Sequence, residues 1–374
     1  MSRVSLFDLS NYYHTRIPKM EKPIVISGEP YERGLAHGRQ LKETIMAAVL
    51  AESQMLRNEI ESRVSHFPID DNLNSLVNKG LDYAKEFALD LLNELKGVAD
   101  GSECALEDLM VFNYFLDFFD LCFEKPRLSL LPVGCTCFAA ADSATRENTV
   151  YIGQNYDWCT TTHPPTLLEI KAPSKPNILC FTIPGLLGCA GMNSEGLGIV
   201  INKLMPIDSQ IGVPYTFVLR KALEQNSIID AMNVIMQAPR TSGISYLLAD
   251  KSGEIICLET TAKDLDVVYA LDDYMVHTNH YTHPRLSVHD ITTRSSNEGD
   301  TYVRWSRMSK LMKRNHGVID LSTLMQFASD HVGYPASVCV HPGTLASIIM
   351  DLRTLTLWMA ERNPCENEYE KFSL

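Results

Sequence analysis

The first feature of this sequence that supports chemistry is a cysteine directly after a glycine, at Gly134–Cys135. An apolar run from Cys137 to Ala141, a polar turn and a second apolar run follow it, and they lead into residues 153–158 (GQNYDW). Two apolar runs joined by a polar turn are typical of a β-hairpin, here with the cysteine at the start of its first strand. A thiol at that place is a candidate nucleophile, and glycine, which lacks a Cβ, lets it approach the preceding carbonyl.

Short motifs accompany this dipeptide in a fixed order along the chain. They are residues 28–38 (GEPYERGLAHG), 153–158 (GQNYDW), 191–196 (GMNSEG), 277–280 (HTNH) and 363–366 (NPCE). Each is unspecific alone, but together they resemble the acyl-CoA:6-aminopenicillanate acyltransferase (isopenicillin-N acyltransferase) family of cysteine peptidases, within the N-terminal-nucleophile (Ntn) hydrolases. The resemblance covers nearly the whole chain after about residue 22.

The resemblance implies an α+β fold, a four-layer αββα sandwich, and an inactive precursor that cuts itself between Gly134 and Cys135. Residues 1–134 would form a mainly helical first chain and residues 135–374 a catalytic chain, associated as one Ntn-hydrolase domain. The released α-amine of Cys135 titrates near ~7.7–8, so it can take the thiol proton in place of a histidine. A papain-like Cys-His pair stays open because there are 11 histidines, although no papain-type signature surrounds any cysteine.

Three polar residues acquire expected roles from the resemblance. Asn279, in the motif 277–280, would give a side-chain amide to the oxyanion hole, against the alternative that it closes a turn after a strand. Asp157 would orient the new ammonium or assist the cut, and Asn155 would hold the same strand end; the alternative is a polar strand end facing water. The carboxamides of Asn279 and Asn155 and the carboxylate of Asp157 have the chemistry that these roles require. Their distances from Cys135 depend on the tertiary structure.

Four other residues are expected to line the substrate pocket. Trp158 matches an aromatic residue of the acyl pocket in the family, with a core tryptophan as the alternative. Tyr156, Met192 and Asn193 are expected at the edge of the same pocket, and the last two belong to a tight turn.

The chain departs from the family pattern at two places. Cys137 stands two residues after the nucleophile, where the penicillin enzyme has a hydroxyl residue implicated in self-cleavage. The arginine of the family's Ser-x-Cys-Arg is absent after Ser337-Val338-Cys339, where Val340 and His341 follow instead. The first departure bears on cleavage efficiency, and the second on the choice of substrate.

No metal ion or cofactor is expected. His277, His280 and His283 are spaced by three and three, which matches no common zinc pattern and lacks a helical carboxylate partner. A zinc enzyme and a non-catalytic binding protein with the same fold remain as alternatives.

Composition excludes some partners. The net charge of −13 argues against nucleic acid and against anionic membrane surfaces, because both require a basic face. No stretch reaches the ~20 apolar residues of a membrane helix, and the N-terminus lacks the apolar core of a signal peptide. Most of the 10 cysteines lie in apolar runs, which is typical of buried thiols in a reducing cytoplasm.

Apolar periodicity predicts the elements that position these residues. Helices are expected over residues 30–57, 72–98, 106–119, 215–236, 302–314 and 321–331, with Gly101 just past the second. Gly34 and Gly38 lie on one helical face and predict close packing against another backbone. Hairpins are expected over residues 166–183, 245–259 and 346–360, beside the one that starts at Cys135.

The function expected from all this is a self-processing amidohydrolase that cleaves a small N-acyl or aminoacyl compound through an acyl-enzyme. The alternative is an acyltransferase that passes the acyl group to an amine, with acyl-CoA or an amine as co-substrate. The sequence does not identify the acyl and amine groups, because neither the dryness of the pocket nor a second amine site can be read from it.

Overall fold

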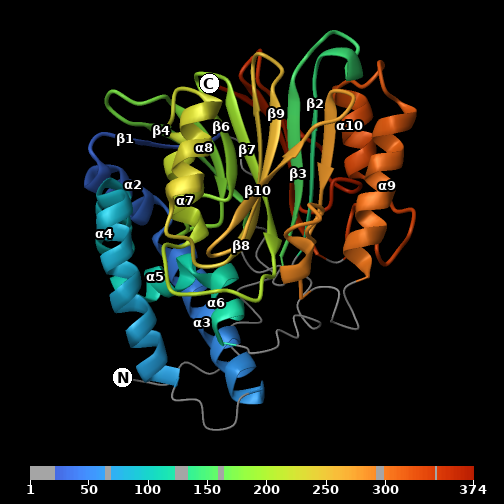
Figure 1. The fold of residues 1–374 in the computed structure, drawn as a ribbon. Helices are drawn as coiled ribbons and strands as arrows, with labels where there is room; N and C mark the ends of the chain where they lie inside the picture. The colour runs from blue at the N-terminus through green and yellow to red at the C-terminus, as the bar shows by residue number, and fades with distance from the viewer. Residues whose placement is uncertain (1–21, 64–68, 123–133, 159–163, 292–298, 342) are drawn as a thin grey trace.

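The computed structural model describes residues 22–63, 69–122, 134–158, 164–291, 299–341 and 343–374. Two β-sheets lie face to face in the middle, and helices cover both outer faces, which gives four layers αββα (Figure 1). The predicted α+β fold, a four-layer αββα sandwich, is confirmed. The hydrophobic core is continuous between the two sheets and under the helices on the larger one.

The larger sheet has eight strands in the order β1-β4-β5-β6-β7-β8-β9-β10. They are β1 (Ile24–Ser27), β4 (Thr166–Lys171), β5 (Ile178–Thr182), β6 (Ala190–Asn193), β7 (Leu197–Leu204), β8 (Gly243–Asp250), β9 (Ile255–Thr260) and β10 (Leu265–Tyr269). β1 runs parallel to β4, with Ile24 opposite Leu168. Residues on both sides of the expected cut therefore build one sheet.

The smaller sheet has six strands in the order β11-β2-β3-β12-β13-β14. They are β2 (Gly134–Ala140), β3 (Tyr151–Asp157), β11 (Tyr274–His277), β12 (Thr344–Asp351), β13 (Thr356–Glu361) and β14 (Glu370–Ser373). The predicted hairpin β2–β3 is confirmed, and Cys135 lies opposite Tyr156 in its register. All residues of both strands are buried, since the sheet is covered on both faces.

The helices before residue 123 are α2 (Pro30–Gln40), α3 (Lys42–Arg63), α4 (Ile69–Ser102), α5 (Leu106–Asn113) and α6 (Phe115–Cys122). The predicted close backbone packing is confirmed: a Cβ on Gly34 would lie 1.8 Å from the Glu94 carbonyl oxygen, and one on Gly38 would lie 2.4 Å from that of Val98. The expected helix end before Gly101 is wrong. α4 continues to Ser102 because Gly101 also packs against α2, where a Cβ would meet the Leu35 carbonyl at 2.6 Å.

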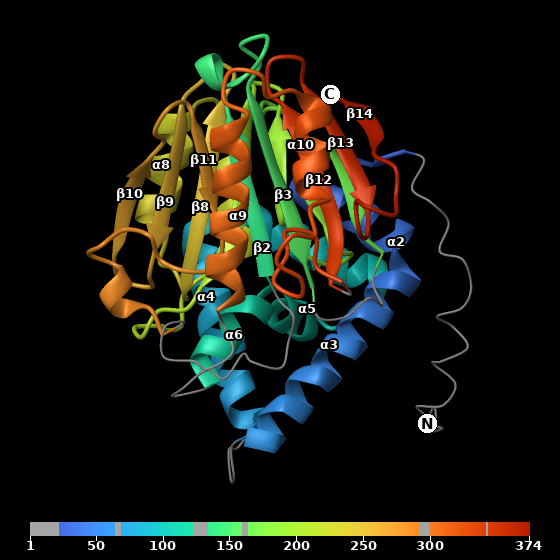
Figure 2. The same cartoon turned by 90° about the vertical axis from the view of Figure 1, so that its right-hand side faces the viewer.

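The later helices are α7 (Tyr215–Leu223), α8 (Ile228–Gln237), α9 (Asp300–Arg314) and α10 (Leu321–Ala328), with short 3₁₀ turns at Asp142–Ala144 and Ser287–His289. The single helix predicted over residues 215–236 is two helices, because Ser227 caps a new helix through the Asp230 N–H. α7 and α8 cover the larger sheet, and α9 and α10 cross the outer face of the smaller one (Figure 2). Among the described residues, no helix combines the length and apolarity needed to traverse a lipid bilayer.

Candidate active site

Cys135 is the second residue of β2, and its side chain lies in the layer between the two sheets. Side chains alternate along a strand, and Cys137, two residues on, donates from its Sγ to the Ile201 carbonyl of the larger sheet at 3.2 Å. Cys135 therefore faces the same way. Its side chain is only 5% exposed, so the thiol is closed off from solvent in the uncut chain.

The backbone of Cys135 is held by three side chains from three distant segments. Its N–H donates to Asn279 Oδ1 at 2.8 Å. Its carbonyl oxygen accepts from Asn202 Nδ2 at 3.0 Å and from Arg304 Nη1 at 2.7 Å. A strand end fixed at both its amide and its carbonyl presents the peptide bond of Gly134–Cys135 in one orientation.

Asn279, in the segment that follows β11, is fixed in turn by residues of α9 and β7. Its backbone N–H donates to Thr301 Oγ1 at 2.8 Å, and its Nδ2 donates to the Lys203 carbonyl at 3.1 Å. A carboxamide nitrogen carries two N–H groups, and the Lys203 contact uses one of them. In the uncut chain the carboxamide presents its oxygen to the Cys135 backbone, and the Lys203 contact leaves one N–H of Nδ2 for the expected oxyanion role.

Arg304 of α9 is a site residue that the sequence did not single out. Besides the Cys135 carbonyl, its guanidinium binds Thr136 Oγ1 at 3.1 Å and Asn279 Oδ1 at 3.0 Å. The side chain is 2% exposed. A buried fork of this kind brings a positive charge to the Gly134–Cys135 segment, although nothing in the pattern of α9 separates Arg304 from its other arginines.

A second buried chain of polar groups leads to the Cys135 carbonyl from the other side. His277 contacts Glu259 Oε1 through Nε2 at 2.9 Å and Asn202 Oδ1 through Nδ1 at 3.2 Å. Burial disfavours the Glu259 carboxylate, but bonds and charge from His277, with bonds from Thr282, outweigh it and lower the pKa of Glu259 to about 2. Both ring nitrogens of His277 therefore lie beside side-chain oxygens, and Asn202 is turned so that its Nδ2 reaches the Cys135 carbonyl.

Asp157 lies opposite Gly134 in the register of the hairpin. Its Oδ1 accepts from Thr344 Oγ1 at 2.7 Å, whereas its buried Oδ2 has no hydrogen-bond partner among the described residues. A Cβ on Gly134 would lie 3.2 Å from that Oδ2 and 3.1 Å from Arg304 Nη2. Burial raises the pKa of Asp157 to about 7, against the opposing effects of the Arg304 charge and the Thr344 bond.

The Cys135 thiol is a poor nucleophile in the uncut chain. Burial, followed by the nearby Asp157 charge, raises its pKa to about 12, although Gln154 and Arg304 act in the other direction. The thiolate is the reactive form of cysteine. At neutral pH this thiol is therefore protonated and needs a base close by.

Asn155 points away from Cys135, toward the outer helices. Its Nδ2 donates to the carbonyls of Ala328 at 2.8 Å and Val338 at 3.0 Å, and its Oδ1 accepts from Ser347 Oγ at 2.6 Å. The structure therefore gives Asn155 the contacts of a strand-end anchor and does not bring it to the thiol.

The aromatic residues expected at the pocket lie near Cys135, in the inner layer. Tyr156 stacks on Trp158 with ring centroids 5.6 Å apart, and Trp158 also packs against Phe115 at 4.9 Å. The indole Nε1 donates to Glu52 Oε1 of α3 at 3.0 Å. Both rings are buried, so in the uncut chain they form part of the core beside the cysteine.

Met192 and Asn193 lie away from the other predicted site residues. They end β6 at the turn before Leu197, whereas Asn202, which contacts Cys135, comes five residues later on β7. Met192 lies opposite Gly198 on β7, so at ~3.3 Å per residue Met192 and Asn193 are roughly 13–16 Å from Asn202 along the strand. Asn193 closes the turn, since its Oδ1 accepts from the N–H groups of Glu195 and Leu197 at 3.0 and 3.2 Å.

The three histidines that were weighed as a metal site have separate partners. His277 contacts Glu259 and Asn202 as above, His280 Nδ1 lies 3.0 Å from Thr301 Oγ1, and His283 Nδ1 lies 2.9 Å from Asp266 Oδ2. Within the described ranges these rings do not converge on one point.

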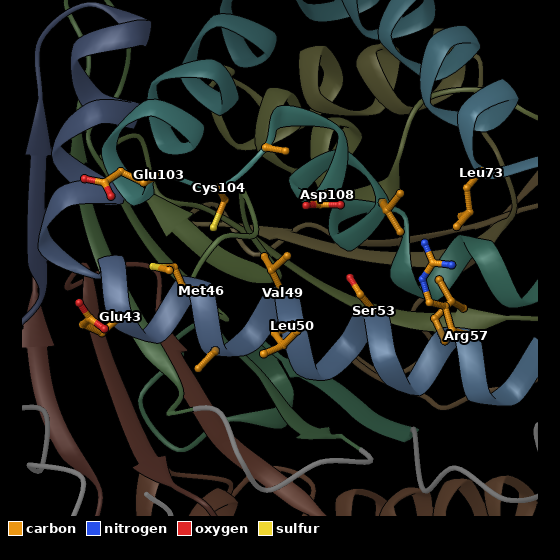
Figure 3. Close-up of a pocket in the computed structure, with 14 residues that line it drawn as sticks. Glu43, Met46, Val49, Leu50, Ser53, Arg57, Leu73, Glu103, Cys104 and Asp108 are labelled. Atoms are coloured by element: carbon orange, nitrogen blue, oxygen red, sulfur yellow. The ribbon is translucent and has the colours of Figure 1, made fainter. Parts of the chain in front are cut away.

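An open groove of about 540 Å³ lies on the helical side of the molecule. Figure 3 shows Met46, Val49 and Leu50 of α3 facing Cys104 and Asp108 across it. Its lining residues do not include those that surround Cys135. The groove is therefore a feature separate from the candidate active site.

Comparisons with known proteins point to one family. The sequence profile described as acyl-coenzyme A:6-aminopenicillanic acid acyl-transferase matches residues 144–366. The acyl-coenzyme A:6-aminopenicillanic-acid-acyltransferase 40 kDa form of Emericella nidulans is 24% identical over 320 residues, which cover 84% of this chain and 84% of that protein. Protein dcd1B of Dictyostelium discoideum is 25% identical over 270 residues, which cover 66% of this chain and 51% of that protein.

Solved structures give a weaker likeness. A variant of the conjugated bile acid hydrolase from Clostridium perfringens aligns with a TM-score of 0.43 and 14% identity over 64% of this chain and 97% of that chain. Penicillin V acylase from Agrobacterium tumefaciens aligns with a TM-score of 0.40 and 13% identity over 61% and 83%.

Proposed function

The chain belongs to the acyl-coenzyme A:6-aminopenicillanic acid acyl-transferase family, and from this premise we propose that it is a self-processing amidohydrolase whose nucleophile is Cys135. It is an enzyme of the Ntn amidohydrolase and acyltransferase group. The identity of the nucleophile and the self-cleavage are the proposed part, since the matched residues 144–366 begin after Cys135.

One observation supports the proposal above the others: the polar groups of four segments converge on Gly134–Cys135. Asn279, Asn202 and Arg304 bind the backbone of Cys135, and the unpartnered Asp157 carboxylate oxygen lies beside Gly134. Buried polar groups are costly unless they are paired. A site that keeps an unpaired carboxylate beside one peptide bond is suited to chemistry on that bond.

The first reaction is the cut. The Cys135 sulfur attacks the Gly134 carbonyl carbon, the C–N bond breaks, and a thioester joins Gly134 to the thiol. Asp157 accepts the thiol proton, and the leaving nitrogen takes up a proton as it becomes the Cys135 amine. Water then hydrolyses the thioester, which leaves a Gly134 carboxylate and a free Cys135 at the start of residues 135–374.

The second reaction is turnover on a small amide. The new α-amine accepts the thiol proton, since its pKa of ~7.7–8 lies close to neutral pH. The thiolate attacks the substrate carbonyl, and the free N–H of Asn279 donates to the developing oxyanion. The amine product leaves with the proton, and water releases the acyl group from the thioester.

The substrate class is a linear or side-chain amide of a small N-acyl or aminoacyl compound. The alternative is transfer of the acyl group to an amine, favoured by the Emericella nidulans relative, whose name describes transfer from acyl-coenzyme A to 6-aminopenicillanic acid. The two differ only in what attacks the acyl-enzyme, water or an amine. Incubation of a panel of N-acyl amides with and without added amines separates them by the product that forms.

The test of the proposal compares the wild-type chain with Cys135→Ala and the control Cys104→Ala, a half-buried thiol outside the site. Denaturing electrophoresis and N-terminal sequencing should give two fragments for wild type and control, the larger beginning Cys-Thr-Cys-Phe, and one intact band for Cys135→Ala. An uncut wild-type chain whose Cys135 resists alkylation would favour a binding protein. A chain that stays whole yet turns over amides would refute the N-terminal nucleophile.

A further inference from the structure

Outside the candidate active site, four side chains of metal-binding type meet at one point. They come from the segment between α10 and β12 and from the turn after β13, and they are His331, Cys339, His341 and Cys365. One ligand atom of each lies within 4.8 Å of the others. From this geometry we propose that these four residues bind one Zn²⁺ ion, a site that goes beyond the proposed amidohydrolase function.

The distances among three of these ligand atoms are close to the edges of a zinc tetrahedron. With Zn–S near 2.3 Å and Zn–N near 2.0–2.1 Å, two sulfur ligands lie about 3.8 Å apart, and a sulfur and a nitrogen about 3.5 Å apart. Here Cys339 Sγ and Cys365 Sγ are 3.7 Å apart. His341 Nε2 lies 3.6 Å from Cys339 Sγ and 3.0 Å from Cys365 Sγ.

The donor set selects the metal. Two thiolates and two imidazoles in a tetrahedral arrangement are typical of Zn²⁺, and four protein ligands leave no open position for substrate. The site is therefore structural. The ring of His331 completes the set, with its centroid 4.9 Å from that of His341.

Neighbouring groups already orient the ligands. Asn363 Nδ2 lies 3.4 Å from Cys339 Sγ, the distance of an N–H donor to a thiolate, and also donates to the Val340 carbonyl at 2.7 Å. His341 Nδ1 lies 3.9 Å from Glu366 Oε1, on the ring side away from the two sulfurs. Zinc-bound histidines commonly give their second N–H to a carboxylate; at 3.9 Å Glu366 is close to this ring nitrogen but is not hydrogen-bonded to it.

The backbone brings the ligands together without the ion. The Cys339 N–H donates to the Asp330 carbonyl at 3.0 Å, which places His331 beside Cys339. Arg307 of α9 holds the Asp330 carboxylate at 2.6 Å. The site could not be predicted from the sequence, because Cys339-x-His341 stands far from Cys365 and matches no common zinc spacing.

The ion would tie together the segment that supports the candidate active site. Val338, one residue before the first cysteine ligand, accepts from Asn155 at 3.0 Å. Thr344, three residues after His341, donates to Asp157 Oδ1 at 2.7 Å. Zinc binding therefore stabilises the partners of two residues at the strand end that faces Gly134.

The experiment uses the full chain with Cys135→Ala, so that it stays uncut and the candidate nucleophile contributes no thiol. The reduced, metal-free protein is titrated with Zn²⁺ against a competing chelator, and metal is counted by mass spectrometry after gel filtration. One zinc per chain is expected. Adding Cys365→Ser should weaken binding by more than about 100-fold, whereas adding Cys104→Ser should leave it unchanged; Cys365 is exposed, so circular dichroism should confirm an intact fold.

Cobalt gives a second readout that a loss of folding does not imitate. Co²⁺ should produce the strong visible bands of a tetrahedral site and a thiolate-to-metal charge-transfer band that weakens in Cys365→Ser. The site would be overturned if the Cys365→Ser protein bound zinc as tightly as its parent, or if the parent bound no stoichiometric zinc. It would also be overturned if zinc binding were lost in a His277→Asn protein instead. So would a Cys339–Cys365 disulfide in the fresh protein whose reduced form fails to take up zinc.

Discussion

Asn279 Oδ1 accepts the backbone N–H of Cys135 at 2.8 Å, across 144 residues of sequence. This contact joins the turn after β11 to the first residues of β2. It also places the carboxamide of Asn279 beside the peptide bond on which the proposed cut occurs. The nitrogen that donates here as an amide would become the basic amine after cleavage.

Asn279→Ala should lower amide turnover by ~10²–10³-fold, because it removes the oxyanion donor beside the thiol. Turnover is measured on the cleaved protein, with Asn226→Ala, an exposed asparagine between α7 and α8, as the matched control. A loss below about threefold would remove Asn279 from the oxyanion hole.

Arg304→Lys should slow self-cleavage by about 10–100-fold, since lysine keeps the charge but not the fork that holds Cys135, Thr136 and Asn279. Each lost charge-assisted bond in a buried site is worth about 1.5–3 kcal/mol. The control is Arg314→Lys, at the exposed end of the same helix. Time courses of refolded precursor on denaturing gels measure the rate, and equal rates for both variants would contradict the role.

Asp157 should make self-cleavage depend on pH near neutrality. Its pKa is raised to about 7, chiefly by burial, so the carboxylate that accepts the thiol proton is formed only as pH rises through about 7. The cleavage rate of refolded precursor is therefore expected to increase between pH 6 and 8.

The same experiment with Asp157→Asn should be slow and lack this inflection, whereas Asp82→Asn, an exposed aspartate of α4, should keep it. A wild-type rate that falls as pH rises over this range would instead mean that the protonated acid is the active form.

Glu259 should give the uncut Cys135→Ala chain acid-sensitive stability. Its folded-state pKa of about 2 lies below the ~4.3 of an unfolded glutamate. The stabilisation is therefore present above about pH 4.5 and lost as pH falls toward about 2. A difference of about two pH units corresponds to about 3 kcal/mol at most.

Urea unfolding at pH 5 and at pH 3 tests this. Glu259→Gln should lose less free energy of unfolding between the two pH values than its parent does, and the exposed-site control Glu254→Gln should match the parent. Identical losses for all three proteins would show that Glu259 and His277 do not form the buried pair.

The sequence alone determined the class of fold and most of its strands. The β2–β3 hairpin, the other paired strands and the glycine-mediated contact of α2 with α4 follow from period-two apolar runs, turn residues and small side chains. These signals are local, so they survive without tertiary information. Helix breaks at Leu41, Tyr114 and Gln225 were missed because apolar periodicity continues across them while packing does not.

The tertiary structure decided which polar residues meet. Cys135, Asp157 and Asn279 were named from sequence. Arg304 and Asn202 reach Cys135, and Thr344 reaches Asp157, only because α9, β7 and β12 converge there. Asn155 lies opposite Thr136, the residue after Cys135, in the register of β2 and β3. Because neighbouring side chains on a strand point to opposite faces, Asn155 and Cys135 lie on different faces of the sheet. Motifs record residue types along the chain, whereas contacts between segments more than 60 residues apart depend on how the two sheets are stacked.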